Sequence, residues 1–124
     1  MSFAAAIAAA QQTAREATGG EITYARGTLT VTLTAGRGIS TFEVQQGDIL
    51  VRVEARDFLI AQEDLKLVGI VETLPARGDK ITETTADGTT FTYEVLEIGS
   101  EPVWRYADEY RQQIRVHTKL IGST

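Results

Sequence analysis

The sequence predicts a mainly β protein: a small β-barrel or sandwich of seven or eight short antiparallel strands, preceded by an N-terminal α-helix. Three observations lead to this prediction. Apolar and polar residues alternate along most of the chain after residue 20, which is the period of a half-buried strand. Turn signals that contain glycine separate these segments at short intervals. The first twenty residues differ, because they are rich in alanine and their apolar residues recur at helical spacing.

The N-terminal segment, residues 1–20, is predicted to be an Ala-rich helix that precedes a β-barrel domain over residues 21–124. Its apolar stripe begins with Phe3 and Ile7, and a pair of glycines ending at Gly20 stops the helix. Phe3 and Ile7 are its only large apolar residues, so the helix buries little surface by itself. It docks either on its own domain or on a neighbouring subunit, and the sequence leaves both open.

The β domain consists of short alternating segments that end at turn signals. The predicted strands contain, in order, Ile22 and Tyr24; Leu29, Val31 and Leu33; Phe42 and Val44; Ile49 to Ala55, continuing after a bend at Asp57 to Phe58 and Ile60; Ile81; Phe91, Tyr93 and Val95; Val103, Trp104 and Tyr106; and Ile114, Val116 and Leu120. Gly36 and Gly38 predict a mobile loop. Ala86-Asp87-Gly88 predicts a hairpin turn, and residues 65–71 form an apolar run that ends before Pro75.

Composition excludes several classes of function. The chain has no cysteine, so it has no disulfide, thiolate metal site or cysteine nucleophile. The net charge of −5 disfavours a protein that grips DNA, since phosphate binding needs clustered Lys and Arg, but it suits the wall of a channel through which DNA slides. No segment approaches the roughly 20 apolar residues that span a bilayer, so no membrane partner is expected.

The sequence shows no pattern typical of a catalytic, cofactor-binding or metal site. His117 is the only histidine, and its strand phase places it opposite the apolar residues, as an exposed or interface side chain. The Asp residues, Asp57 among them, occur mostly in turn contexts, where this side chain accepts backbone hydrogen bonds. Arg77-Gly78-Asp79 matches an adhesive tripeptide, but a turn explains it. We therefore predict no enzyme activity and no cofactor.

Basic and aromatic residues gather near the C-terminus, which is typical of a protein interface. Together with the helix stripe, the predicted interface residues are Phe3, Ile7, Trp104, Arg105, Tyr106, Tyr110, Arg111 and Arg115. The same residue types stack on single-stranded nucleic acid, so an oligonucleotide-binding small barrel is the alternative from another class. The acidic net charge and the acidic residues within this segment favour the protein interface.

Several segments, taken in order and spacing, resemble one known family. They are the strand 49–60 with the turn after it, Gly78-Asp79 with Ile81, Tyr93-Glu94-Val95, Trp104-Arg105, and residues 114–119. Over about residues 21–121 the chain resembles the head–tail joining proteins of tailed bacteriophages, of the head-completion or stopper type. Each segment alone is common among small barrels, so the likeness depends on their order.

The resemblance implies a structural virion protein that forms a ring below the portal, helps to retain packaged DNA and receives the tail. The implied partners are other copies of the chain in a ring of six or twelve, a portal or adaptor protein above, a tail terminator or tail tube protein below, and double-stranded DNA in passive contact. The implied location is the virion neck, after synthesis in the host bacterial cytoplasm. The resemblance leaves two other roles in the same neck open, those of a tail terminator and of a portal adaptor. It also leaves open whether the chain comes from a phage, a prophage or a gene transfer agent.

The resemblance also implies a long loop that points into the channel. Its predicted channel-facing residues are Gly36, Arg37, Gly38, Gln45, Gln46 and Gly47.

Overall fold

The computed structural model describes residues 20–124, and this part of the protein is mainly β. The predicted N-terminal helix therefore lies outside the described residues, except for Gly20, which begins the first strand. A 3-10 turn occupies Gln62–Asp64. The seven strands are β1 (Gly20–Arg26), β2 (Leu29–Gln46), β3 (Ile49–Ala61), β4 (Lys80–Thr84), β5 (Thr90–Val95), β6 (Trp104–Tyr106) and β7 (Gln113–Ser123).

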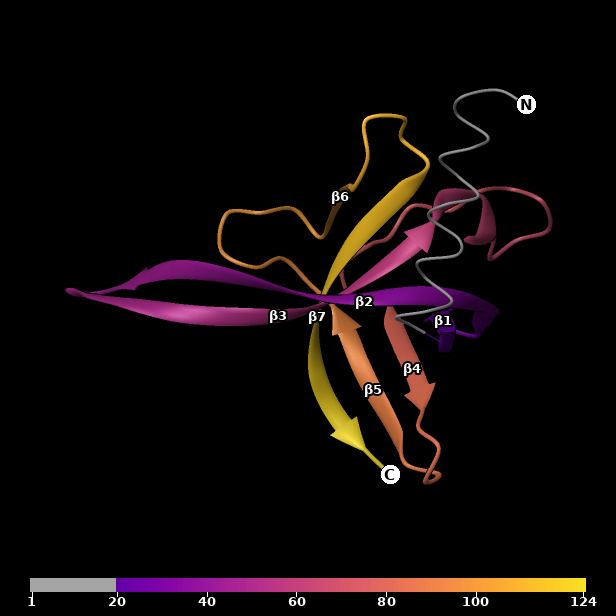
Figure 1. The fold of residues 1–124 in the computed structure, drawn as a ribbon, viewed down its shortest axis with the longest axis horizontal. Helices are drawn as coiled ribbons and strands as arrows, with labels where there is room; N and C mark the ends of the chain where they lie inside the picture. Colours follow the sequence, from indigo (N-terminus) through magenta and orange to yellow (C-terminus); the bar gives the residue numbers. More distant parts are fainter. Residues whose placement is uncertain (1–19) are drawn as a thin grey trace.

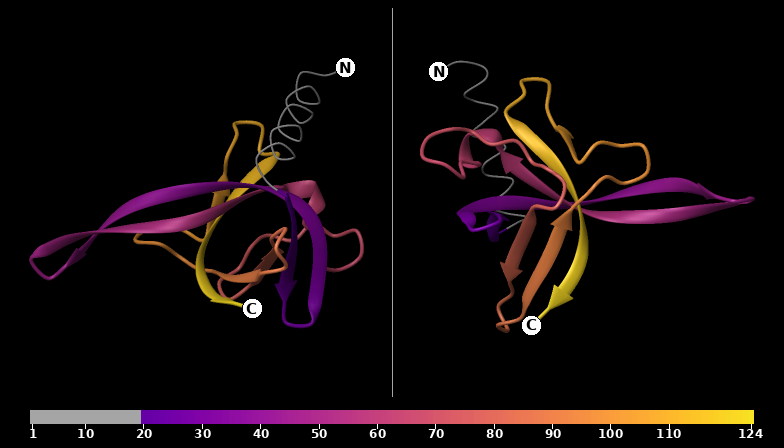
Figure 2. Two further views of the ribbon diagram at one scale, coloured as in Figure 1. Left: turned by 60° about the horizontal axis from the view of Figure 1, so that its bottom comes forward. Right: turned by 180° about the vertical axis from the view of Figure 1, so that it is seen from behind.

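The strands form one antiparallel sheet whose pairings close into a circuit. Neighbours follow the order β3-β2-β1-β4-β5-β7-β6, and β7 also pairs with β3, so β6 lies outside the circuit on the edge of β7. Figure 1 shows the paired β2 and β3 extending away from the other strands, and the turned views in Figure 2 show the same extension. The predicted mainly β fold of seven or eight antiparallel strands is confirmed.

The hydrophobic core lies among the strands of this circuit, because alternate residues of each strand point to the same face. Ile114 and Val116 of β7 are fully buried, as the strand phase predicted. The Phe58 ring meets the Tyr93 ring edge-on, with centroids 5.2 Å apart. The buried cluster comprises Ile22, Tyr24, Leu33, Ala35, Phe58, Ile60, Leu65, Leu67, Ile81, Tyr93, Val95, Ile114 and Val116. No residue between 36 and 57 belongs to it, so the extension of β2 and β3 is held by other contacts.

The two glycines in β2 do not form a loop, and this prediction was wrong. Pairing of β2 with β3 begins with Gly36 opposite Leu59 and passes through Gly38 without interruption. It continues in one register to Gln46 opposite Ile49. A glycine within a strand costs roughly 0.5–1 kcal/mol of backbone entropy relative to alanine. The antiparallel partner offsets that cost by supplying hydrogen bonds along the whole segment.

β3 also differs from the prediction. The strand continues without interruption through Asp57, so this aspartate lies in a strand and not in a turn. The first half of β3 is part of the extension, where Val51 and Val53 are half-buried and Arg52 and Glu54 are exposed, as the alternation predicted, whereas Ile49 is 66% exposed. By contrast, the predicted turns at Asp48 and Asp87 are confirmed, each linking two antiparallel neighbours.

A buried carboxylate, Asp79, fixes the turn before β4. Arg26 donates to both of its oxygens, with Nε 2.9 Å from Oδ1 and Nη2 2.8 Å from Oδ2. Tyr24 and the backbone N–H of Ala76 also donate to Oδ2. Burial opposes ionisation, but the hydrogen bonds from Arg26, Tyr24 and Ala76 prevail and hold the pKa of Asp79 below its ordinary value. With only 3% of Asp79 exposed, the tripeptide that ends there is not available to a receptor.

This network predicts an acid-sensitive contribution to folding. Because the pKa of Asp79 is lower in the folded state, the contribution is complete above the ordinary pKa of 3.8 and is lost as the pH falls through the folded value. We expect Asp79→Asn to be less stable than wild type at neutral pH, with the difference shrinking in acid. Urea unfolding across an acid titration measures this. Asp48→Asn, in an exposed turn, is the control, and a pH-independent difference for Asp79→Asn would contradict the account.

Candidate interaction surface

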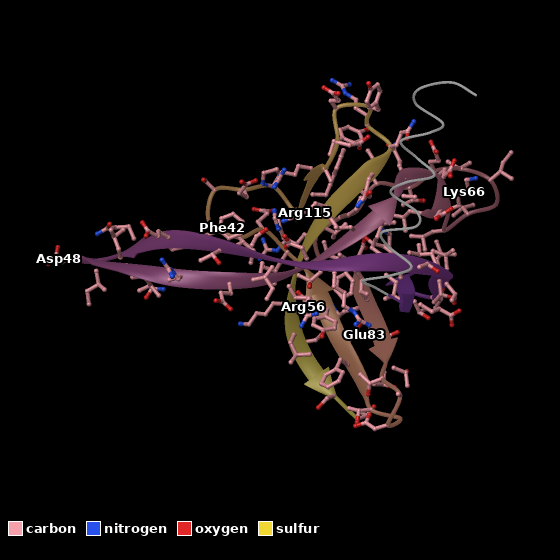
Figure 3. The ribbon with its side chains drawn as sticks, in the orientation of Figure 1. Phe42, Asp48, Arg56, Lys66, Glu83 and Arg115 are labelled. Atoms are coloured by element: carbon pink, nitrogen blue, oxygen red, sulfur yellow. The ribbon has the colours of Figure 1, made fainter. Side chains whose placement is uncertain are left out.

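The most distinctive feature of the molecule is the projecting part of β2 and β3. We call residues 39–55 the arm: within the described chain its two strands pair only with each other, joined by a turn at Gly47 and Asp48. Figure 3 shows Asp48 at the free end of the arm, with Phe42 and Arg115 nearer to the other strands. The arm exposes both of its faces and both of its outer edges over much of its length.

The cross-strand register gives the arm an apolar face and a polar face, since side chains of directly paired residues point the same way. The apolar face carries the pairs Phe42–Val53 and Val44–Val51, whereas the polar face carries the pairs Glu43–Arg52 and Thr41–Glu54. The four apolar side chains are half-buried. A turn between β5 and β6 passes beside them, because a Cβ on Gly99 would lie 3.8 Å from Cγ2 of Val44.

A buried polar network holds the base of the arm. Asp57 is fully buried, and its Oδ2 accepts hydrogen bonds from the hydroxyl of Ser40 and from Nη1 of Arg115 at 3.1 Å. The same Nη1 lies 3.2 Å from the Ser40 hydroxyl. Oδ1 of Asp57 lies 2.8 Å from Nδ1 of His117. The network therefore joins β2, β3 and β7 at the point where the arm leaves the sheet.

His117 is buried, with 1% of its surface exposed, so the prediction of an exposed side chain was wrong. Its strand phase was right, because it shares a face with Arg115 and both side chains reach Asp57. The face is covered by the base of the arm, where the ring of Phe42 meets the imidazole edge-on at 5.3 Å. An ionised carboxylate only accepts, so His117 donates through Nδ1. Its Nε2 has no hydrogen-bond partner among the described residues.

Gly38 borders this network. A Cβ at Gly38 would lie 3.4 Å from Nη2 of Arg115 and 4.0 Å from Cβ of Asp57, so the backbone of β2 lies next to the guanidinium group. Asp57 and Ser40 were not among the predicted site residues. The sequence did contain a signal for Asp57, because it is an isolated aspartate inside a segment with the period of a strand. A charged side chain that is buried in a strand needs a partner.

Exposed apolar side chains gather at two opposite places. At the end of the arm, Ile49 and Leu50 are 66% and 63% exposed. The segment between the 3-10 turn and β4 carries a second group, Val68, Ile70, Val71 and Leu74, of which Ile70 is 89% exposed. In Figure 3, Asp48 and Lys66 mark these two regions on opposite sides of the molecule. Apolar surface of this kind is typical of protein interfaces.

The predicted C-terminal interface residues differ in how far they are exposed and in what they contact. Trp104 and Tyr106 are half-buried against the core and meet edge-on, with centroids 5.0 Å apart. Arg111 lies 5.7 Å from the Tyr106 ring centroid. Arg115 belongs to the network at the base of the arm. The remaining described residues of this set, Arg105 and Tyr110, are exposed, whereas Phe3 and Ile7 lie outside the described chain.

The predicted channel residues lie at the two ends of one hairpin. Gly36, Arg37 and Gly38 are at the base of the arm, within β2. Nη2 of Arg37 lies 2.7 Å from Oε2 of Glu83 in β4, so the charge of Arg37 is used in an ion pair between two strands. Gln45, Gln46 and Gly47 lie at the free end and are exposed. The structure thus shows a paired hairpin, with the same free end, in place of the predicted loop.

The described residues contain no cluster of three or more metal-ligating side chains. Within the same part of the chain, no helix is long and apolar enough to cross a membrane. The carboxylates of Asp57, Asp79 and Glu83 are used in ion pairs that hold strands together. What the described surface offers is therefore contact area: a hairpin with two unlike faces, two unpaired strand edges and exposed apolar groups.

A family model described as phage head-tail joining protein matches residues 1–124, which is the full sequence. No curated protein matches the chain.

Proposed function

The chain belongs to the phage head–tail joining protein family and so has a structural role in the phage neck, and we propose that it acts there as a ring below the portal that retains packaged DNA and receives the tail. The observation that supports this proposal is the arm. The arm projects beyond the other strands and its free end is exposed, so it can reach from a subunit of the ring towards the channel.

We assign the arm to the DNA channel, in place of the mobile loop that the sequence indicated. Between residues 39 and 55 the arm carries three carboxylates, Glu43, Asp48 and Glu54, and one arginine, Arg52. Its net charge is therefore −2. An acidic hairpin repels the phosphate backbone, so DNA slides past it without binding. The free end, with Gln45 to Asp48, is the part that meets DNA in this arrangement.

The body of the domain provides the contacts above and below. Arg105 and Tyr110 are exposed on the side opposite to the core, near the cation–aromatic pair of Arg111 and Tyr106. Aromatic and arginine side chains are the residue types that dominate binding energy at protein interfaces. We assign this surface to the portal or adaptor protein, or to the tail proteins. Nucleic-acid stacking is less suited to it, because Trp104 and Tyr106 pack on each other and on the core.

Interrupting the reading frame in a phage that encodes this protein tests the role. We expect capsids that package DNA, lose it on storage or dilution, and carry no tails, and we expect plaque formation to return when the protein is supplied in trans. Electron microscopy and nuclease-sensitive DNA measure these outcomes. Tails of abnormal length on stable heads would indicate a tail terminator instead. Normal yields of tailed, infectious particles would contradict any essential role in the neck.

A further inference from the structure

We propose that the apolar stripe of the N-terminal segment, which begins with Phe3 and Ile7, covers an exposed apolar turn of its own chain. This turn lies between the 3-10 turn and β4, and we call its four exposed residues the apolar turn: Val68, Ile70, Val71 and Leu74. The inference goes beyond the role in the neck and does not depend on it. Three features support it: the way the turn is built, the composition of the segment, and the distance that the segment can reach.

The fold holds the apolar turn in a defined position. Leu65 and Leu67, which precede it, are buried in the core. The backbone N–H of Val71 donates to the carbonyl oxygen of Val68 at 3.1 Å, and the N–H of Thr73 donates to the carbonyl oxygen of Leu65 at 2.7 Å. The turn is therefore tied to the core on one side and closed by its own hydrogen bonds on the other, so its apolar side chains are presented as a fixed surface.

The residue types of this turn do not suit water. Gly69, with a φ of 57°, is a residue that tight turns require. The residue after it, however, is Ile70, which is 89% exposed. Solvated turns mostly use Gly, Pro, Asn, Asp and Ser, and a branched apolar side chain has no local role there. Glu72 is the only charged residue between positions 67 and 75. This surface therefore fits an apolar partner.

The N-terminal segment has the matching composition. Residues 2–14 contain no charged side chain, and Phe3 and Ile7 are four positions apart, which places them side by side on one face of the predicted helix. An isolated helix of about 15 residues is marginal in water. A helix over residues 3–17 therefore needs a surface on which to pack its stripe, and an uncharged apolar surface suits it best.

The apolar turn lies near one end of β1, the strand that the N-terminal segment enters. Gly20 begins this strand and Arg26 ends it. Nη2 of Arg26 donates to the carbonyl oxygen of Leu74 at 2.8 Å. Along the strand, Gly20 and Arg26 are roughly 20 Å apart. The N-terminal segment must therefore span about this distance, in the direction of β1, to cover the apolar turn.

The segment is long enough to do so. With residues 3–17 helical and residues 18–20 extended, Ile7 reaches up to roughly 25 Å from the start of β1 and Phe3 up to roughly 31 Å. The chain must reverse its direction before β1, and the pair of glycines that ends at Gly20 permits such a reversal. Both large apolar side chains can thus reach the apolar turn of the same copy.

The exposed apolar group at the end of the arm is farther away. Ala35 is opposite Gly20, and Gln46 is opposite Ile49. The length of β2 from Ala35 to Gln46 is roughly 36 Å, which exceeds the reach of both Phe3 and Ile7. Within one copy, the distances therefore favour the apolar turn over the end of the arm as the surface that the segment covers.

The rate of thiol alkylation in the purified full-length protein tests the inference, because the natural chain has no cysteine. The thiol introduced by Ile70→Cys is alkylated in two backgrounds, the natural segment and a segment with Phe3→Ser and Ile7→Ser. We expect alkylation to be several-fold slower with the natural segment, because the docked stripe covers the thiol. We also expect this protection to be the same at all protein concentrations, since the segment and the turn belong to one chain.

The matched control is Ile49→Cys, which is also exposed but lies at the end of the arm. Its alkylation rate should be the same in both backgrounds. Equal rates for Ile70→Cys in the two backgrounds, or equal protection of both thiols, would overturn the inference. Protection that disappears on dilution would also overturn it, because the segment would then cover a second copy. All of these outcomes leave the role in the neck standing, since that role is tested by interrupting the reading frame.

Discussion

Asp57→Ala is expected to lower the free energy of unfolding by about 3 kcal/mol, since removing one partner of a buried ion pair leaves the other charge unpaired. Asp57 is fully buried, and the side chain of Arg115 that it holds is 25% exposed. His117 and Ser40 lose their partner at the same time. Chemical denaturation of the purified protein measures the change.

Two further variants make this result interpretable. Asp48→Ala removes the same side chain at the exposed free end of the arm, where the effect is expected to stay within about 0.5 kcal/mol. The double variant Asp57→Ala with Arg115→Ala is expected to cost less than the two single variants together, because the two residues share one interaction. A small effect of Asp57→Ala, similar to that of Asp48→Ala, would contradict the stabilising role assigned to the network.

Shortening the arm is expected to abolish the production of infectious particles while the domain still folds. The change removes residues 43–52 and joins Phe42 to Val53 by an Asn-Gly turn, which suits a two-residue hairpin. Ser40, Phe42 and the network at the base are retained, and none of the removed residues belongs to the core. Thermal unfolding of the shortened chain should stay close to wild type. Complementation of the gene-deficient phage should fail as completely as with no protein.

The control for this experiment keeps the length of the arm. Gln45→Ala changes one exposed side chain near the free end and should restore plaque formation. If the shortened chain restores infectious particles to the wild-type level, the arm is not the functional element and the assembly surface lies on the body of the domain. A shortened chain that fails to fold would instead show that the arm stabilises the sheet, contrary to its absence from the core.

The sequence predicted the class of fold well, because strand period and turn chemistry are local properties. The alternation around Ile114 and Val116 identified the core face of the last strand, and Ala86-Asp87-Gly88 identified a hairpin. The resemblance, which depended on the order of several segments, identified the family that the full-length match confirms. The segments around Leu29 and Phe42, predicted as separate strands, are parts of the single strand β2.

The arm and its base could not be predicted in the same way. Gly36 and Gly38 carry a local signal for a loop, and only a partner strand far along the chain converts them into a strand. The burial of His117 and Asp57 also depends on non-local contacts, since the base of the arm covers a face that would otherwise meet water. A period of two says which residues share a face but does not say which faces are covered.

The most direct test of the whole account is a localised cryo-EM reconstruction of the neck in intact virions. The account predicts a ring of this protein between the portal and the tail, with each arm, residues 39–55, directed towards the channel axis and its free end nearest to the DNA. Density for the protein elsewhere in the particle, or arms lying on the outer surface of the neck, would contradict it.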